Sequence, residues 1–432
     1  MSTVLVGGGP AASGLLTAAA RTGALDALLD DGLTVVDAGP AARFGSGRLG
    51  GYLVRSDTRA RVFAECAAPA LGGRDTPDGL LARCESDEPV PLRLAAALLA
   101  AAGRRVLRRV RADPRAAVRS GTEVTGLRAG PDGVTLRVAG QPPIRADRVV
   151  LTVGGRPWTP PDLPAGGRLV LHSDQVLRED GYRRALAQLA GAVPRVTVVG
   201  GSHSAFAVAG LLLRAPVRWA PGAITVAHRS PVLVTYPDGA AARAEGLQFG
   251  ADQVCPATGM VHRFGGLRAD AAGLYQRVRR GTESRVRLVR VPAGWDWFAD
   301  VARDDPVVVA ATGYASAATG LLDCGARGGC GALGDDGALG DGRGLGDGGG
   351  LGDGRARRDG GGAWWDGEGR LRTACGDLVP QVFGLGLGTR RPRGPRTGGE
   401  PAFQGAIDGV WFYQNVVAPE VLSLVLSGGS LG

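Results

Sequence analysis

The chain has 432 residues, of which 73 are glycine and 44% are hydrophobic, so it is long enough for two or three globular domains. The formal net charge is +9, and every fixed positive side chain is arginine because the sequence contains no lysine. The arginines are spread along the chain and lack the interleaved aromatic residues of single-strand binders, so we expect no nucleic-acid partner.

The six cysteines form no Cys-x-x-Cys pair. This argues against a thioredoxin-type dithiol reductase and a zinc ribbon, and we expect no metal site. The sequence shows no signal-peptide pattern at its start and no apolar run long enough to cross a bilayer. We therefore expect a cytoplasmic protein without a membrane partner.

The first nucleotide-type motif lies in residues 3–23, which predict a strand, a tight turn and a helix. Its small residues have separate tasks: the first permits the turn, the second lets a pyrophosphate approach the backbone, and the last lets the helix pack on the strand. Asp37 ends the next predicted strand and is placed to accept hydrogen bonds from ribose hydroxyls. The alternative is a glycine-rich turn without a ligand. The expected turn residues are Gly7, Gly9, Pro10 and Ala12.

A second motif of the same kind follows the strand that precedes Gly200, with Ser202 at the usual position of the second glycine and Ser204 next in the pattern. The following predicted strand ends in Arg229 and Ser230 instead of an acidic residue. Because arginine pairs with a 2′-phosphate and a carboxylate repels it, this exchange favours NADPH over NADH. The alternative is a degenerate unit that no longer binds a nucleotide. Two such turns in one chain are explained if one holds FAD and the other NADPH.

Several stretches now resemble the class B flavoprotein monooxygenases, a group that includes amine N-hydroxylases, flavin-containing monooxygenases and Baeyer–Villiger enzymes. The matching stretches are "GGGPAAS", "LTVGGRPWTPP", "GGSHSA", "AHRSP" and "VVAATGYAS". The Ala-Thr-Gly-Tyr run at 311–314 is the most specific of them. The chain departs from the family where Ser202 and His203 replace Gly and Gln, and where His172-Ser173 follow without the family's phenylalanine.

The resemblance implies a fold and an activity. The fold is α/β, with two Rossmann-like dinucleotide-binding domains: a glutathione-reductase-like FAD domain with an inserted NAD(P)-binding domain. We expect the FAD domain at 1–160 and 301–432, including a strand at 306–314 and a helix from about 403, and the NADPH domain at 165–300. A Gly/Asp-rich insertion at about 325–362 carries hexads at 333–356. We expect it to be flexible, because the calcium-binding alternative uses a nine-residue repeat.

The implied enzyme is an FAD- and NADPH-dependent monooxygenase that oxygenates a small metabolite with molecular oxygen through a C4a-(hydro)peroxyflavin. N-hydroxylation is favoured, in bacterial natural-product biosynthesis. The alternatives are a flavin-dependent dehydrogenase or reductase that forms no peroxyflavin, and a non-catalytic nucleotide-binding protein. His203 and Tyr52 are the expected catalytic residues. Further cofactor contacts are expected from Arg48, Thr152, Gly154, Thr312, Gly313 and Asp408.

Overall fold

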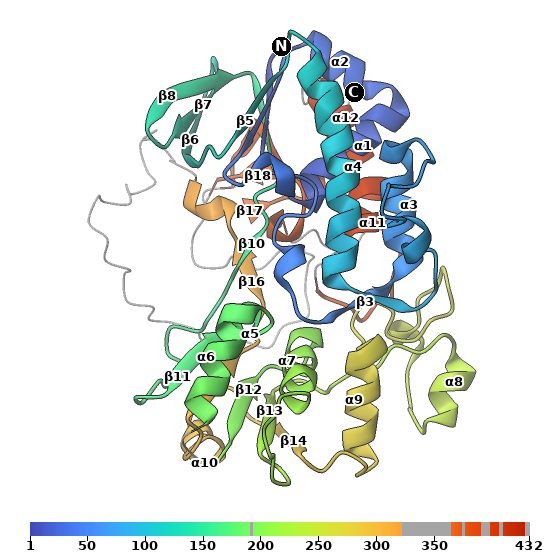
Figure 1. Ribbon diagram of the computed structural model, residues 1–432, viewed down its shortest axis with the longest axis vertical. Coiled ribbons are helices and arrows are strands. Elements are labelled where there is room, and N and C mark those ends of the chain that lie inside the picture. The colour runs from blue at the N-terminus through green and yellow to red at the C-terminus, as the bar shows by residue number, and fades with distance from the viewer. Residues whose placement is uncertain (191–192, 322–363, 374–375, 390–397, 406–408, 428–432) are drawn as a thin grey trace.

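The computed structural model describes residues 1–190, 193–321, 364–373, 376–389, 398–405 and 409–427 (Figure 1). Within them, two mainly parallel sheets form the centres of an upper and a lower unit in Figure 1. The Gly/Asp-rich stretch expected at about 325–362 lies outside the described residues.

The first sheet is built around β1, whose residues Thr3–Val6 are all buried and pair in parallel with β2 and β9. Such β-branched and leucine-rich runs are typical of strands covered on both faces. The edge strands β17 and β18 are antiparallel additions to the parallel strands. In order, the sheet contains β17 (Trp364–Trp365), β18 (Arg370–Arg372), β19 (Leu378–Gly384), β9 (Arg148–Leu151), β1, β2 (Leu33–Asp37) and β5 (Ala117–Ser120).

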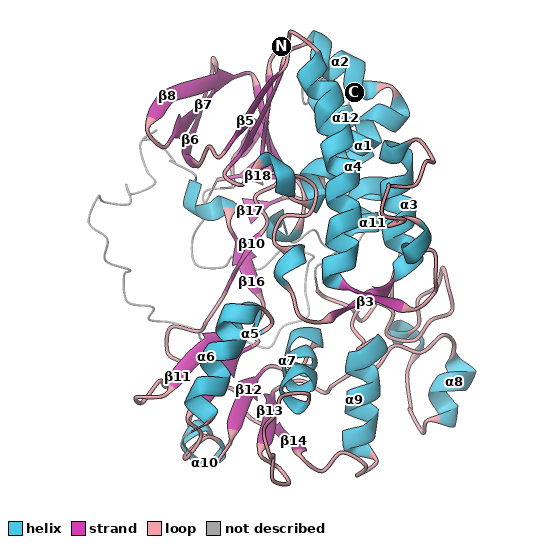
Figure 2. Cartoon of the chain, viewed as in Figure 1, coloured by secondary structure: helices cyan, strands magenta, loops and turns pink. Residues whose placement is uncertain are grey.

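Helices cover one face of this sheet and a small antiparallel sheet covers the other (Figure 2). The covering helices are α1 (Pro10–Thr22), α2 (Ala24–Asp30) and α12 (Ala418–Leu426). The antiparallel layer consists of β6 (Val124–Gly130), β7 (Gly133–Val138) and β8 (Gln141–Ala146). Beside the helices, α3 (Ala60–Leu71) packs on the long α4 (Leu92–Ala112).

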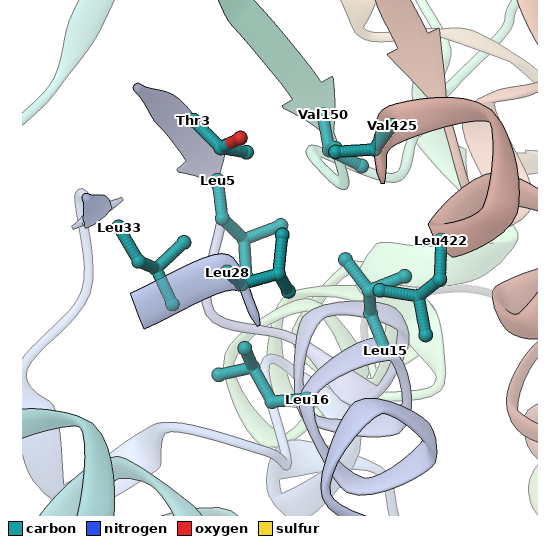
Figure 3. Close-up of a pocket in the computed structure, with 9 residues that line it drawn as sticks. All are labelled: Thr3, Leu5, Leu15, Leu16, Leu28, Leu33, Val150, Leu422 and Val425. Atoms are coloured by element: carbon teal, nitrogen blue, oxygen red, sulfur yellow. The ribbon is translucent and has the colours of Figure 1, made fainter. Parts of the chain in front are cut away.

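The helix-facing core contains one small void among the side chains drawn in Figure 3. Its volume is about 10 Å³, and all its lining residues except Thr3 are apolar. A space of this size barely admits one water molecule, so it is a packing gap and no ligand site.

The second sheet is entirely parallel and has its own cores on both faces. Its strands, in order, are β11 (Leu169–His172), β15 (Val307–Ala310), β12 (Val196–Val199), β13 (Ile224–His228) and β14 (Val286–Arg290). The helices of this unit are α5 (Ser173–Val176), α6 (Glu179–Leu189), α7 (His203–Leu213), α8 (Gly239–Ala244), α9 (Ala269–Arg279) and α10 (Phe298–Val301).

Two expectations need correction. The strand expected at 306–314 within the FAD segment is β15, which pairs with β11 and β12 of the second sheet. Its buried apolar sequence suits either sheet, and only the pairing decides. The last helical segment begins at Val410, in α11 (Val410–Phe412), and not near residue 403. Gly409 precedes it with φ +147°, a conformation that favours glycine, so the helix does not extend back through this residue.

None of the helices in the described part of the chain is both long enough and apolar enough to cross a membrane.

We expect Leu16→Ala to lower the free energy of unfolding by about 3 kcal/mol, because Leu16 is fully buried beside the void and the truncation enlarges it. Urea unfolding of the purified protein measures the change. Leu378→Ala is the matched control, since Leu378 is 36% exposed and its loss should cost less than about 1 kcal/mol. Equal shifts for the two variants would contradict this account of the core.

Candidate functional site

A two-stranded ribbon joins the carboxyl ends of the two sheets. Strand β9 leads into β10 (Gly155–Pro157), and β15 leads into β16 (Tyr314–Ser316). The two short strands pair antiparallel, between the two sheets in Figure 1. Parallel α/β sheets bind ligands outside the carboxyl ends of their strands. The ribbon therefore brings the two ligand-binding edges toward each other.

The expected residues Thr152, Gly154, Thr312 and Gly313 lie where the sheets enter this ribbon. The Thr312 hydroxyl donates a hydrogen bond to the Trp158 carbonyl (2.6 Å), and the Trp158 N–H donates to the Gly313 carbonyl (3.1 Å). Gly154 has φ +74°, and its carbonyl accepts from the Ala317 N–H (3.1 Å). These residues shape the crossing between the sheets.

The first glycine turn is closed on one side and open on the other. Gly7 has φ +108°, and a Cβ there would lie 2.7 Å from the Thr152 carbonyl oxygen. A Cβ on Gly9, the residue that precedes α1, would meet nothing within 4 Å. Pro10 is the first residue of the helix, and Ala12 is fully buried against the core. The space at the Gly9 Cβ position is therefore open, and the N–H groups of this helix start are of the kind that receives a pyrophosphate.

Asp37 ends β2, and its carboxylate lies against this turn. The approach is so close that a Cβ added to Gly8 would overlap the carboxylate. Burial raises the pKa of Asp37, and backbone N–H groups of Gly39 and Gly8 partly offset the effect. The loop that carries the exposed Arg48 is fastened to the same turn, since the Gly45 N–H donates to the Gly8 carbonyl (2.7 Å). The residues present thus fit an adenosine-type ligand: a cradle, a helix start and a carboxylate at the ribose position.

The second turn repeats the backbone of the first. Gly200 has φ +141°, and a Cβ there would overlap the Ala311 carbonyl. The Gly200 N–H donates to the Ala227 carbonyl at 2.8 Å, as the Gly7 N–H does to Val36 at 2.8 Å. Ser202 is exposed and precedes α7, and its hydroxyl does not cap the helix. Ser204 lies in the first turn of α7. This helix start is therefore available to a second phosphate group.

Arg229 and Ser230 are exposed directly after β13. The Ser230 carbonyl lies 2.9 Å from Nδ1 of His228. Arg290, at the end of the neighbouring β14, donates its Nε–H to the Arg229 carbonyl (3.4 Å). Two arginines thus lie near the end of β13, whereas the acidic Asp37 ends β2, the corresponding strand of the first sheet.

His203 is the first residue of α7 rather than part of a loop. Its Nε2 accepts the backbone N–H of Arg268 (3.0 Å) and lies 3.5 Å from Oδ2 of Asp57. Burial lowers the pKa of His203, and the Asp57 charge counteracts only part of that effect. The ring is therefore neutral near pH 7, with its proton on Nδ1.

Tyr52 reaches from the first unit to the second, where its hydroxyl donates to the buried carboxylate of Asp174. The Arg178 guanidinium also donates to this carboxylate, and the Tyr314 hydroxyl lies 3.4 Å from Oδ1. Burial, with the neighbouring Tyr314 and Asp174, raises the pKa of Tyr52 far above its usual value, so the phenol stays protonated. Sequence reasoning missed Asp174 and Arg178, although Asp174 directly follows the His172-Ser173 pair that it did note.

His172 ends β11 beside this cluster and is buried. Its ring lies near the Trp158 carbonyl, but neither ring nitrogen makes a hydrogen bond of normal geometry within the described residues. Burial lowers the pKa of His172, so it is also neutral near pH 7. Asp408, expected at the start of the last helix, lies outside the described residues.

Apart from Gly154, Thr312 and Gly313 at the crossing between the sheets, most of the expected residues form two groups. The residues Gly7, Gly9, Pro10, Ala12, Asp37, Arg48 and Thr152 gather at the first turn, and Gly200, Ser202, His203, Ser204, Arg229 and Ser230 gather at the second. Tyr52 belongs to neither group in this structure, because Asp174 takes up its hydroxyl. The described residues contain no cluster of His, Cys, Asp and Glu side chains that could hold a metal ion.

Known proteins resemble the chain over nearly its whole length. It is 32% identical, over 452 aligned residues, to the CMP-5′-(3-aminopropyl)phosphonate hydroxylase of Streptomyces rubellomurinus (strain ATCC 31215), covering 99% of this chain and 97% of that protein. No family model matches the chain.

Solved structures share the fold at lower identity. The L-lysine 6-monooxygenase of Pseudomonas syringae superposes with a TM-score of 0.55 at 15% identity, covering 99% of both chains. The ornithine N-hydroxylase of Kutzneria sp. 744, solved with reduced FAD, NADP⁺ and L-ornithine, gives 0.54 at 16% identity, again over 99% of both chains. These likenesses confirm the expected two-domain α/β fold of the dinucleotide-binding flavoproteins.

The relative at 32% identity extends the likeness from the fold to the family, because it aligns over almost the full length of both proteins. The two glycine turns, the Ala-Thr-Gly-Tyr run that enters the ribbon and this relative agree with one another. The chain belongs to the class B flavoprotein monooxygenases.

Proposed function

We propose that this monooxygenase N-hydroxylates a primary amine on a small metabolite that carries a phosphonate or phosphate ester. The relative is named as a hydroxylase of CMP-5′-(3-aminopropyl)phosphonate, a compound with both groups. The formal charge of +9, carried by arginine, attracts an anionic substrate over long range. In the balanced reaction, R–NH₂, O₂, NADPH and H⁺ give R–NHOH, NADP⁺ and H₂O.

The observation that carries the proposal is the pair of nucleotide cradles on sheet edges joined by one ribbon. FAD would occupy the first cradle, with its pyrophosphate at the start of α1 and a ribose on Asp37. NADPH would occupy the second, with its pyrophosphate at the start of α7 and its 2′-phosphate on Arg229. When bound, FAD supplies the activation of molecular oxygen. Two edges joined in this way would bring the two cofactors close together, which hydride transfer between them requires.

The residues of the chain bind, orient and shield these groups. We assign Ser202 and Ser204 to the second phosphate site and neutral His203 to the orientation of its helix start. Tyr52 would close the cleft from the first unit through Asp174, and thereby keep water out. Arg48 would lie along the flavin side of the first cradle. The pattern of sheet pairing supports a domain division in which the NADPH unit runs from about 165 to 311 and the FAD unit contains the remainder.

We expect Gly9→Ala to fold normally and to lose most of its FAD, because its added methyl meets no protein atom and projects into the space assigned to the pyrophosphate. Gly7→Ala should instead destabilise the apoprotein, since φ +108° and the Thr152 carbonyl oppose a Cβ there. Flavin absorbance per protein and the melting temperature of the apoprotein separate the two effects. Full flavin content in Gly9→Ala would contradict the assigned cradle.

We expect Arg229→Ala to raise KM for NADPH by about 10- to 100-fold and to leave KM for NADH nearly unchanged, because only NADPH carries the 2′-phosphate. Arg303→Ala is the matched control: Arg303 is also exposed but precedes β15, at the opposite end of the sheet. An equal change with both nucleotides would remove Arg229 from the phosphate site.

The proposed amine substrate is tested with the FAD-loaded enzyme and two compounds, 3-aminopropylphosphonate and its CMP conjugate. We expect the amine to stimulate NADPH oxidation and oxygen uptake, and mass spectrometry to detect a product with one added oxygen atom. The N-acetylated substrates are the control, because acetylation removes the nucleophilic lone pair. NADPH oxidation without an oxygenated product would support a flavin reductase instead, and equal turnover of the acetylated compounds would exclude nitrogen as the target.

A further inference from the structure

A charged contact joins the two units next to the second cradle. Asp57 lies on β3 (Arg55–Arg59), which contacts α9 of the second unit. The Arg268 guanidinium donates from Nη2 to Oδ2 of Asp57 at 2.7 Å, across 211 residues of sequence. In Figure 1, β3 lies above α9, and α7 stands beside α9. The contact therefore ties the first unit to the helices that border the second cradle.

Arg268 connects this contact to the starts of two helices, α7 and α9. It is the residue before α9, and its backbone N–H donates to Nε2 of His203 (3.0 Å), the first residue of α7. Its other terminal nitrogen donates to the Arg263 carbonyl (3.1 Å). His203 directly follows Ser202, so the orientation of the imidazole is coupled to the backbone that would receive the phosphate.

The charges at this contact favour a fixed geometry. The side chains of Asp57, Arg268 and His203 are 38%, 35% and 25% exposed, so solvent screens them only in part. Burial raises the pKa of Asp57, but the charge and the hydrogen bond of the Arg268 guanidinium oppose this effect, and the pKa lies below its usual value. Asp57 is therefore ionised at neutral pH.

We propose that Asp57 is a positioning residue for the NADPH site: through Arg268 and His203 it holds the start of α7 in the orientation that receives the nucleotide phosphates. The proposal rests on the proposed use of this cradle for NADPH. Asp57 itself contacts neither cofactor in this account. Its effect is expected at the second site, because Arg268 and His203, the residues that it meets across the interface, both lie in the second unit.

The test measures NADP⁺ binding by calorimetry on the FAD-loaded protein, together with steady-state kinetics. We expect Asp57→Asn to raise the Kd for NADP⁺ and the KM for NADPH by about tenfold, the equivalent of one charge-assisted hydrogen bond. Flavin content, melting temperature and kcat at saturating NADPH should stay close to wild type. A purely structural role would instead lower stability or flavin content and leave the Kd unchanged.

Asp270→Asn is the control. It breaks the Arg55–Asp270 pair (3.6 Å), which joins the same two elements but does not reach His203. Arg268→Gln should reproduce the effect of Asp57→Asn. The double variant should bind NADP⁺ no more weakly than either single variant, because both changes break the same contact. If Asp57→Asn fails to fold, Arg268→Gln carries the same test.

The outcomes separate the two proposals. Wild-type protein that binds FAD but not NADP⁺ would refute the proposed NADPH site. Wild-type protein that binds NADP⁺, with unchanged affinity in both Asp57→Asn and Arg268→Gln, would refute the positioning role alone. An effect of Asp270→Asn as large as that of Asp57→Asn would also refute it, because the effect would then come from the interface in general.

Discussion

The architecture depends on one constraint: a parallel sheet offers its turns and helix starts only at the carboxyl ends of its strands. Two nucleotides that must meet therefore require two such edges turned toward each other. The β10–β16 ribbon achieves this because each of its strands continues from a central strand of a different sheet. The buried carboxylate of Asp174, with its tyrosine and arginine partners, adds a second link between the same edges.

In both sheets, the glycine turn between a strand and its helix has the same backbone conformation. In each, a glycine with positive φ lies against the carbonyl of the residue that follows the neighbouring strand: Gly7 against Thr152, and Gly200 against Ala311. The two turns differ in the residues at the end of the next strand along the chain. Asp37 ends the strand beside the first turn, whereas Arg229 and Ser230 follow the strand beside the second. The same turn is thus followed by an acidic strand end in the first sheet and by a basic residue in the second, and the proposed assignment of two different cofactors rests on this difference.

Much of this was accessible from the sequence because its determinants are local. Glycine spacing, a buried β-branched strand and the residue at the end of the next strand lie within about 35 residues of one another and obey general rules of backbone geometry. The sheet membership of β15 was not accessible, because a run of buried valines fits either sheet and only long-range pairing decides. The contacts Tyr52–Asp174 and Asp57–Arg268 join residues 122 and 211 positions apart, and no local pattern marks them.

These missed contacts add to the β10–β16 ribbon in joining the two units. Interfaces between domains are more polar than cores, and relative motion is expected unless something directional restrains it. Apolar packing alone tolerates sliding, whereas a carboxylate that accepts from a guanidinium or a phenol fixes both distance and angle. Besides the ribbon, a few charged and phenolic groups between the units therefore help to fix the arrangement of the two cradles. The turns proposed to bind the nucleotides are local and can be found in the sequence, whereas the contacts between the units join residues far apart in the chain and cannot.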